Sequence, residues 1–113
     1  MDNIKDDRYY LNRIITDITF ILDHTDRIAS IKAFESDEVL LDSVMFRLIQ
    51  ISENSDRLTP EFKEEHADIP WHAMRGMRNR IVHEYGEVDL SIVYDTLKID
   101  LPALLRDIEN IVQ

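Results

Sequence analysis

The sequence contains no cysteine, and only two of its 113 residues are glycine and three are proline. The absence of cysteine excludes disulfides, cysteine–zinc sites and thiol chemistry. The scarcity of glycine and proline indicates a mostly helical protein with few tight turns, because both residues interrupt helices. A chain of this length is expected to form a single domain, residues 1–113, with a core that needs no covalent cross-links.

The sequence also lacks a long uninterrupted apolar run and a basic, apolar leader. Because a membrane-spanning helix needs about 20 consecutive apolar residues, no membrane span is predicted. Residues 1–7 are mostly polar and acidic, so no signal peptide is predicted either. We therefore expect a cytoplasmic protein with no membrane partner.

Positive charge is scarce, since 13 lysines and arginines oppose 23 aspartates and glutamates, which gives a formal net charge of −10. This balance disfavours diffuse binding to nucleic acid, which depends on clustered cations, but it permits a local site. The sequence contains no Glu-x-x-His pair and no His-Glu-x-x-His motif, the signatures of di-iron bundles and of zinc proteases. We expect neither a metal nor a cofactor.

Hydrophobic residues recur at three- and four-residue spacing in the first half of the chain, which is the period of amphipathic helices. This pattern predicts one long helix over residues 8–33. A break is expected at residues 34–38, where Ser36 can accept a hydrogen bond as the cap of a second helix. The second helix should run to about Asp56.

The second half of the chain predicts three further helices. Thr59-Pro60 is a strong start signal for a short helix that ends near His66. The next helix follows Pro70 and should end at Gly86 in a left-handed conformation. Asp89 caps the last helix, in which Pro102 should cause a kink near residues 99–101. The predicted fold is all-α, an antiparallel up-and-down bundle of four main helices and a short one.

A cationic segment, residues 71–85, stands out in this acidic chain because it holds three arginines and two histidines against one glutamate. An ideal helix turns about 100° per residue. Placed on such a helix, the segment forms a polar stripe of His72, Arg75, Asn79 and His83, with Arg78 and Arg80 on its two shoulders. The opposite face is apolar and consists of Met74, Met77, Ile81 and Tyr85.

These residue types suit metal-independent cleavage of RNA. A histidine can take the proton from a ribose 2′-hydroxyl, while an arginine stabilises the negative charge that develops at phosphorus. Arg78 and His83 are five residues apart, hence roughly 140° apart around a helix. Three arrangements would bring them together: a distorted helix, an arginine that wraps around it, or a second copy of the chain. The last arrangement predicts a homodimer.

The same spacing has a plainer interpretation. An Arg-x4-His pair arises by chance in many helices, and a cationic face can simply pair with Asp and Glu residues in solvent-exposed ion pairs. In that case the protein would be a purely structural helical bundle. Spacing alone does not separate the two interpretations.

The residues Trp71 and Gly76-Met77-Arg78-Asn79-Arg80-Ile81-Val82-His83-Glu84-Tyr85 resemble the signature of the HepT-like proteins, a branch of the HEPN superfamily. The hallmark of the superfamily is Arg-x4–6-His, extended in this branch to Arg-x4-His-x-Tyr. Residues 49–53 and 101–104 are also similar to the family, and the resemblance covers residues 8–111. It implies an all-α HEPN bundle, usually dimeric, whose motif lines a cleft between the protomers.

The resemblance also implies a function. HepT-like proteins are endoribonuclease toxins that are paired with a Mnt-type nucleotidyltransferase antitoxin. By this resemblance Arg78 would stabilise the phosphate, His83 would act as acid and base, and Asn79 would orient His83 or the RNA. Tyr85 matches the tyrosine that the antitoxin modifies with AMP, which would add negative charge beside the cationic cleft and block RNA. The candidates for additional RNA contacts are Arg75, Arg80 and His72, although for His72 and Arg75 a surface residue without a function is the default interpretation.

The sequence is also compatible with a protein that cuts no RNA. A non-catalytic HEPN module would dock a nucleotidyltransferase or bind a nucleotide instead. Tyr85 projects to the apolar face of an ideal helix, so it can be a core aromatic residue rather than a modification site. Its hydroxyl would reach the surface if Gly86 ended the helix early.

Overall fold

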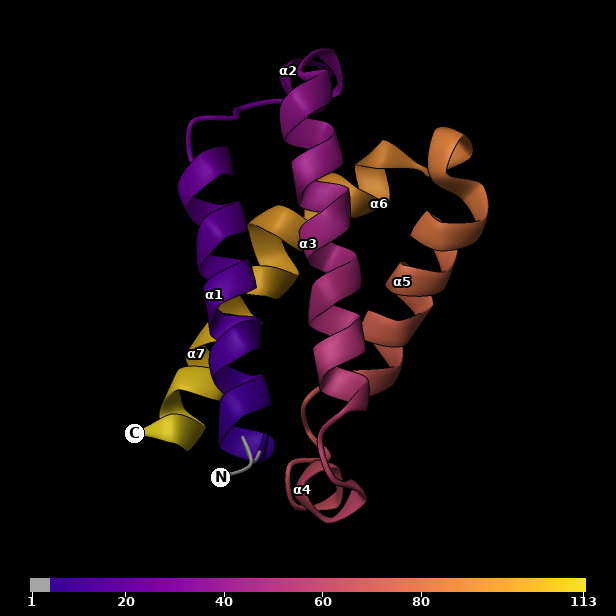
Figure 1. Cartoon of the computed structure of the whole chain (residues 1–113). Helices are drawn as coiled ribbons and strands as arrows, with labels where there is room; N and C mark the ends of the chain where they lie inside the picture. Colours follow the sequence, from indigo (N-terminus) through magenta and orange to yellow (C-terminus); the bar gives the residue numbers. More distant parts are fainter. Residues whose placement is uncertain (1–4) are drawn as a thin grey trace.

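The computed structural model describes residues 5–113, and within this range it consists of helices and the turns between them. Four long helices run alternately up and down, with α3 between α1 and α5 and with α7 against α1 (Figure 1). This arrangement confirms the predicted all-α antiparallel bundle. The bounds of the four helices are α1 Asp7–Thr25, α3 Glu38–Asp56, α5 Trp71–Glu84 and α7 Leu101–Val112.

Shorter helices connect the long ones at the two ends of the bundle (Figure 1). The helix α2 (Ile31–Ser36) joins α1 to α3 at one end, and α4 (Pro60–Glu65) joins α3 to α5 at the other. The chain then returns through α6 (Leu90–Asp95) to α7. At the end of α7 the side chain of Arg8 donates a hydrogen bond to the carbonyl of Val112 over 3.3 Å, which joins the first helix to the last.

The hydrophobic core lies between α1, α3 and α7, and α5 contributes little to it. Within α5 only Ile81 is buried, whereas α1 and α3 each bury several apolar side chains. Since apolar burial is the main stabilising contribution to folding, α5 is an edge helix whose remaining faces are free to bind other molecules. The buried apolar residues are Leu11, Ile14, Ile18, Ile21, Phe34, Val44, Met45, Leu48, Ile51, Leu58, Ile69, Ile81, Val93, Leu97, Leu101, Leu104 and Ile108.

The expectation of a single helix over residues 8–33 is wrong. The helix α1 ends at Thr25, and α2 begins after Ser30, whose hydroxyl accepts a hydrogen bond from the Ala33 backbone over 3.1 Å. The ammonium of Lys98 donates to the carbonyl of Thr25 over 2.9 Å and so completes the end of α1 from a distant part of the chain. Ile28 continues the helical spacing of apolar residues beyond Thr25 and packs against the core. The hydrophobic pattern therefore gives no sign that the helix ends at Thr25.

The predicted cap of α3 is also wrong by one residue. The carboxylate of Asp37 accepts a hydrogen bond from the Leu40 backbone over 3.1 Å and caps α3. The hydroxyl of Ser36 instead donates to the carbonyl of Lys32 over 2.8 Å inside α2. Both residues are good caps, so the sequence could not decide between them without knowing that α2 continues through Ser36.

The remaining predicted helix starts are confirmed. Thr59 accepts a hydrogen bond from the Phe62 backbone over 3.2 Å, with Pro60 in the first turn of α4. Asp89 accepts one from the Ser91 backbone over 2.9 Å at the start of α6. These starts were predictable because each rests on a local capping interaction.

The irregularity expected before Pro102 is confirmed as a π-helical segment, Thr96–Asp100. The backbone N–H of Leu101 donates to the carbonyl of Thr96, five residues back, before the proline that has no N–H to donate. The expectation for Gly86 is wrong, because α5 ends at Glu84 and a 3₁₀ turn, Tyr85–Glu87, follows. No described residue, Gly86 included, has a positive φ angle.

Candidate functional site

The helix α5 carries the cationic segment along the edge of the bundle (Figure 1). Its inner face packs on the core through Met74, Met77 and Ile81. The other face is exposed, as the helical projection predicted, and it presents His72, Arg75, Asn79 and His83. The polar stripe is therefore a surface that another molecule can contact.

Arg78 lies at the junction between α5 and α3, where two side chains fix its guanidinium. Its Nε donates to Oε1 of Glu53 over 2.9 Å, and its Nη1 donates to Oδ1 of Asn79 over 2.9 Å. An arginine has five N–H groups in a planar fork, so these two contacts orient the group and leave donors for a phosphate. Asn79 thus acts on Arg78 in this structure, whereas the prediction gave it the task of orienting His83 or RNA.

Arg75 forms an ion pair with Asp56, with Nη2 and Oδ1 2.7 Å apart. The hydrogen bond and the negative charge of Asp56 raise the pKa of Arg75. Both side chains are exposed, and exposed ion pairs contribute little to stability. The ion-pair interpretation therefore accounts for Arg75 and for part of the environment of Arg78, but it does not account for the histidines.

Arg80 lies on a different side of α5 from Arg78. It lines a groove of about 410 Å³ between α5 and the chain from Ile92 to Leu104, together with Met77. Hydrogen bonds from Ser91 lower the pKa of Asp89, and the charge of Arg80 lowers it further. The structure therefore separates Arg80 from the other predicted RNA-binding residues, Arg75 and His72.

His83 lies in the last turn of α5, and its imidazole is exposed. It is about 7.5 Å from Arg78 along the helix axis, at a rise of about 1.5 Å per residue. Among residues 5–113 no side chain or backbone group forms a hydrogen bond or ion pair with its imidazole. Because α5 is a regular helix through both residues and Arg78 turns toward Glu53, a single chain does not bring Arg78 and His83 into contact.

Tyr85 is not a core residue, so the interpretation as a core aromatic is wrong. The residue is 47% exposed, and its hydroxyl donates a hydrogen bond to the carboxylate of Asp42 in α3. Partial burial and the contact with Asp42 raise the pKa of Tyr85 to about 12. The 3₁₀ turn that starts at Tyr85 interrupts the regular projection, which explains why the ideal helix misplaced this side chain.

Three acidic residues that were not predicted from the sequence contact the candidate site: Asp42, Glu53 and Asp56. They share one face of α3, because separations of 11 and 14 residues are close to whole numbers of helical turns. Each contacts a different residue of the cationic segment: Tyr85, Arg78 and Arg75, respectively. This periodic row of carboxylates is the signal in the sequence that would have identified them.

The candidate site contains no cluster of metal ligands. Among residues 5–113 no group of three or more His, Asp or Glu side chains is arranged to hold a metal ion. In the same part of the chain, no helix is long and apolar enough to cross a membrane.

Comparison with known families identifies the class of the protein. The model of the family described as ribonuclease HepT-like matches residues 14–111. The chain therefore belongs to the HepT-like ribonuclease family of the HEPN superfamily, which confirms the resemblance seen in the sequence.

Three relatives illustrate the family. A protein of Caldanaerobacter subterraneus subsp. tengcongensis, named "Putative RNase TTE0752", is 32% identical over 97% of this chain and 97% of its own. The "Probable ribonuclease HepT" of Thermococcus cleftensis is 32% identical over 90% of this chain and 92% of its own. In Methanocaldococcus jannaschii, the "Gamma-glutamylcyclotransferase and putative RNase MJ0434" is 33% identical over 96% of this chain but only 49% of its own. No solved structure matches the chain.

Proposed function

We propose that this chain is a metal-independent endoribonuclease and the toxin of a toxin–antitoxin pair. The observation that carries the proposal is the arrangement at α5, where Glu53 and Asn79 hold Arg78 and where His83 is exposed without a partner in the described chain. A fixed guanidinium and a free imidazole are the two groups that cleavage of RNA through its 2′-hydroxyl requires. The names of the family relatives support the same activity.

In the proposed reaction His83 takes the proton of a ribose 2′-hydroxyl, and the 2′-oxygen attacks the neighbouring phosphorus. Arg78 donates hydrogen bonds to the phosphate oxygens, on which negative charge increases in the transition state. The 5′-oxygen then leaves and takes up a proton. The products are a cyclic phosphate and a free 5′-hydroxyl, and no metal takes part.

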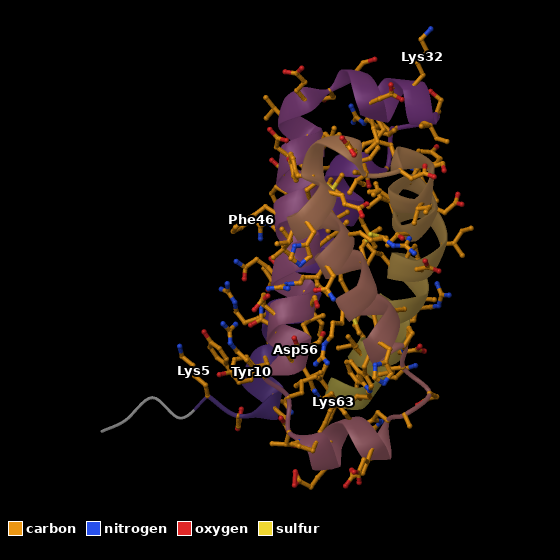
Figure 2. The ribbon with its side chains drawn as sticks, turned by 90° about the vertical axis from the view of Figure 1, so that its right-hand side faces the viewer. Lys5, Tyr10, Lys32, Phe46, Asp56 and Lys63 are labelled. Carbon is orange, nitrogen blue, oxygen red and sulfur yellow. The ribbon has the colours of Figure 1, made fainter. Side chains whose placement is uncertain are left out.

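The proposed active form is a homodimer. Arg78 and His83 diverge on one α5 helix, so a second copy with its own α5 across a shared cleft would supply the missing group. Two exposed apolar side chains, Phe46 of α3 and Val82 of α5, support a contact surface beside the site. Phe46 points outward from the bundle (Figure 2).

The proposed regulation is adenylylation of Tyr85 by a nucleotidyltransferase antitoxin. The support from the structure is the position of the hydroxyl, which lies on a half-exposed ring just after the helix that carries Arg78 and His83. A phosphate added there would place negative charge beside the cleft and repel RNA. The Arg-x4-His-x-Tyr motif of residues 78–85 is intact, which is the second support.

The first prediction tests the nuclease directly. Purified wild-type protein should cut a labelled RNA in buffer that contains a metal chelator. His83→Ala and Arg78→Ala should each lower the cleavage rate at least about 100-fold, because general acid–base and electrostatic catalysis each contribute factors of this size. Expression of the wild type should inhibit growth, and co-expression of the nucleotidyltransferase should relieve the inhibition.

His24 offers a matched control, because it is an exposed histidine whose Nδ1 contacts the Phe20 carbonyl on α1, and α3 lies between α1 and α5 (Figure 1). His24→Ala should retain wild-type cleavage. Cleavage by the His83→Ala and Arg78→Ala proteins at the wild-type rate would contradict the proposal. A wild-type chain that binds the nucleotidyltransferase without cutting RNA would identify a non-catalytic module instead.

A further inference from the structure

The hydroxyl of Tyr85 faces acidic side chains on α3. It donates its hydrogen bond to Asp42. A shallow pocket of about 260 Å³ lies at the ring, and its two charged lining residues are Glu38 and Asp42. The rest of the lining is mainly apolar, with Leu41, Met45, Val88 and Leu90. The phenolic oxygen therefore lies next to a carboxylate that can accept its proton, and within residues 5–113 the pocket around the ring has no cationic lining residue.

A tyrosine needs such an acceptor in order to react with a phosphate ester. An ordinary phenol, with a pKa of about 10, is almost wholly protonated near neutral pH and is a weak nucleophile. Partial burial and Asp42 raise the pKa of Tyr85 to about 12, so the free phenolate is rarer still. The hydroxyl must then lose its proton as the new bond forms, and a base within hydrogen-bond reach makes this possible.

We propose that Asp42 is the general base for the adenylylation of Tyr85, a role that rests on the modification proposed above. Oη of Tyr85 attacks the α-phosphorus of a nucleoside triphosphate that the nucleotidyltransferase holds. The new bond joins Oη to phosphorus, the bond from that phosphorus to the bridging oxygen breaks, and pyrophosphate leaves. The phenolic proton passes to the carboxylate of Asp42, which later releases it to water.

Asp42→Asn tests this role, because asparagine keeps an oxygen that accepts the phenolic hydrogen bond but does not take the proton. The readout is the initial rate at which the Tyr85 peptide gains an adenylyl group, measured by mass spectrometry. The reaction contains ATP, magnesium and a purified Mnt-type nucleotidyltransferase. Asp42→Asn should lower the turnover rate at least tenfold, with an unchanged dissociation constant for the nucleotidyltransferase.

Glu38→Gln is the matched control, since it removes one negative charge from the same pocket without touching the phenol, and its rate should stay within twofold of the wild type. Asp42 is exposed, so the Asp42→Asn protein should fold and still cut RNA. Adenylylation of this variant at the wild-type rate or faster would overturn the role of Asp42 and leave the modification intact. No adenylylation of the wild type would overturn both.

Discussion

At the scale of single residues, the position of Arg78 depends on Glu53. The two side chains belong to different helices and meet at 2.9 Å, and both are partly exposed. Glutamate at this position has two opposing effects. It fixes the guanidinium in one orientation, and it places a negative charge close to the site where a phosphate would bind.

The two effects of Glu53 can be separated with Glu53→Gln, which keeps the shape of the side chain and removes its charge. We expect the turnover rate for RNA cleavage to fall about tenfold with little change in KM, because a loosened arginine is misaligned in the transition state. The melting temperature should stay nearly constant, since a partly exposed ion pair contributes little to stability. Steady-state kinetics and thermal unfolding measure both quantities.

Asp56→Asn is the control for this prediction, because it breaks the exposed ion pair of Arg75 on the same face of α3. Its turnover rate should stay within twofold of the wild type. Equal effects of the two substitutions would mean that only the local charge matters. Faster cleavage by Glu53→Gln would mean that the glutamate restrains binding of RNA and does not align Arg78.

The sequence predicted the cationic residues but not their partners. Helical projection shows which residues of one helix share a face, and it correctly exposed Asn79 and His83. It does not show which neighbouring helix that face meets. The contacts of Glu53 and Asp42 could therefore be identified only once the packing of α3 against α5 was known. The position of Tyr85 could be identified only once the 3₁₀ turn after α5 was known.

At the scale of helices, the start of α3 depends on one capping residue. The carboxylate of Asp37 accepts a hydrogen bond from the Leu40 backbone at the N-terminal end of α3. Asp42, the partner of Tyr85, lies five residues after Asp37 on the same helix. Loss of a cap typically costs about 1 kcal/mol. Since Asp37 is exposed, no other role complicates its replacement.

Asp37→Ala should therefore lower the free energy of unfolding by about 1 kcal/mol, measured as a shift in the midpoint of urea denaturation at constant slope. Ser36→Ala is the comparison, because Ser36 donates inside α2 and caps nothing. It should change stability by less than about 0.5 kcal/mol, as exposed substitutions away from special features do. A larger loss of stability for Ser36→Ala than for Asp37→Ala would mean that Ser36 caps α3, as predicted from the sequence.

Helix starts were predictable where a local signal fixes them. The ends of α3 near Asp56 and of α4 near His66 were also predicted correctly, whereas the ends of α1 and α5 were not. Thr59 and Asp89 accept their capping hydrogen bonds from backbone groups within three residues, and this local signal was enough to predict both starts, although Thr59 also donates to Asp7, 52 residues away. The end of α1 at Thr25 depends instead on Lys98, 73 residues away in the chain. No pattern within α1 reports such a contact, and for this reason the predicted helix ran on to residue 33.

At the scale of the whole molecule, two exposed apolar side chains lie beside the candidate site. Phe46 is 56% exposed and Val82 is 46% exposed. Along α3, Phe46 lies between Asp42, the partner of Tyr85, and Glu53, the partner of Arg78. Along the other helix, Val82 lies between Arg78 and Tyr85. The apolar contact surface therefore coincides with the proposed cleft.

Phe46→Glu should weaken the proposed dimer at least tenfold and lower nuclease activity in parallel, as measured by sedimentation and by cleavage at several protein concentrations. A charge placed in an apolar contact opposes association because it must lose water. Ile99→Glu is the control, since Ile99 is 65% exposed on the π-helical segment, belongs to neither α3 nor α5 and does not line the groove next to α5. Similar weakening by both substitutions would contradict the placement of the interface.

The shared site has a sharper test in the same preparation. In a dimer of one Arg78→Ala chain and one His83→Ala chain, one cleft would combine the intact Arg78 with the intact His83. Half of the dimers in a fully exchanged equal mixture are mixed, and each has one active cleft out of two, so mixing the two inactive proteins should restore about a quarter of the wild-type cleavage rate. A mixture as inactive as its components, with exchange of subunits verified, would place each site within a single chain.

The ion pairs of Arg75 and Arg78 have a consequence for how RNA binding responds to salt. When a cationic protein binds nucleic acid, the phosphates release condensed cations, so affinity falls as salt rises. Here the arginines already have carboxylates as counterions. A phosphate that displaces Asp56 from Arg75 leaves this acid to take up cations from solution, and a phosphate that binds the remaining donors of Arg78 beside Glu53 brings two negative charges together, which also attracts cations. That uptake offsets part of the release. The affinity for RNA should therefore depend on salt less steeply than the number of arginine–phosphate contacts implies.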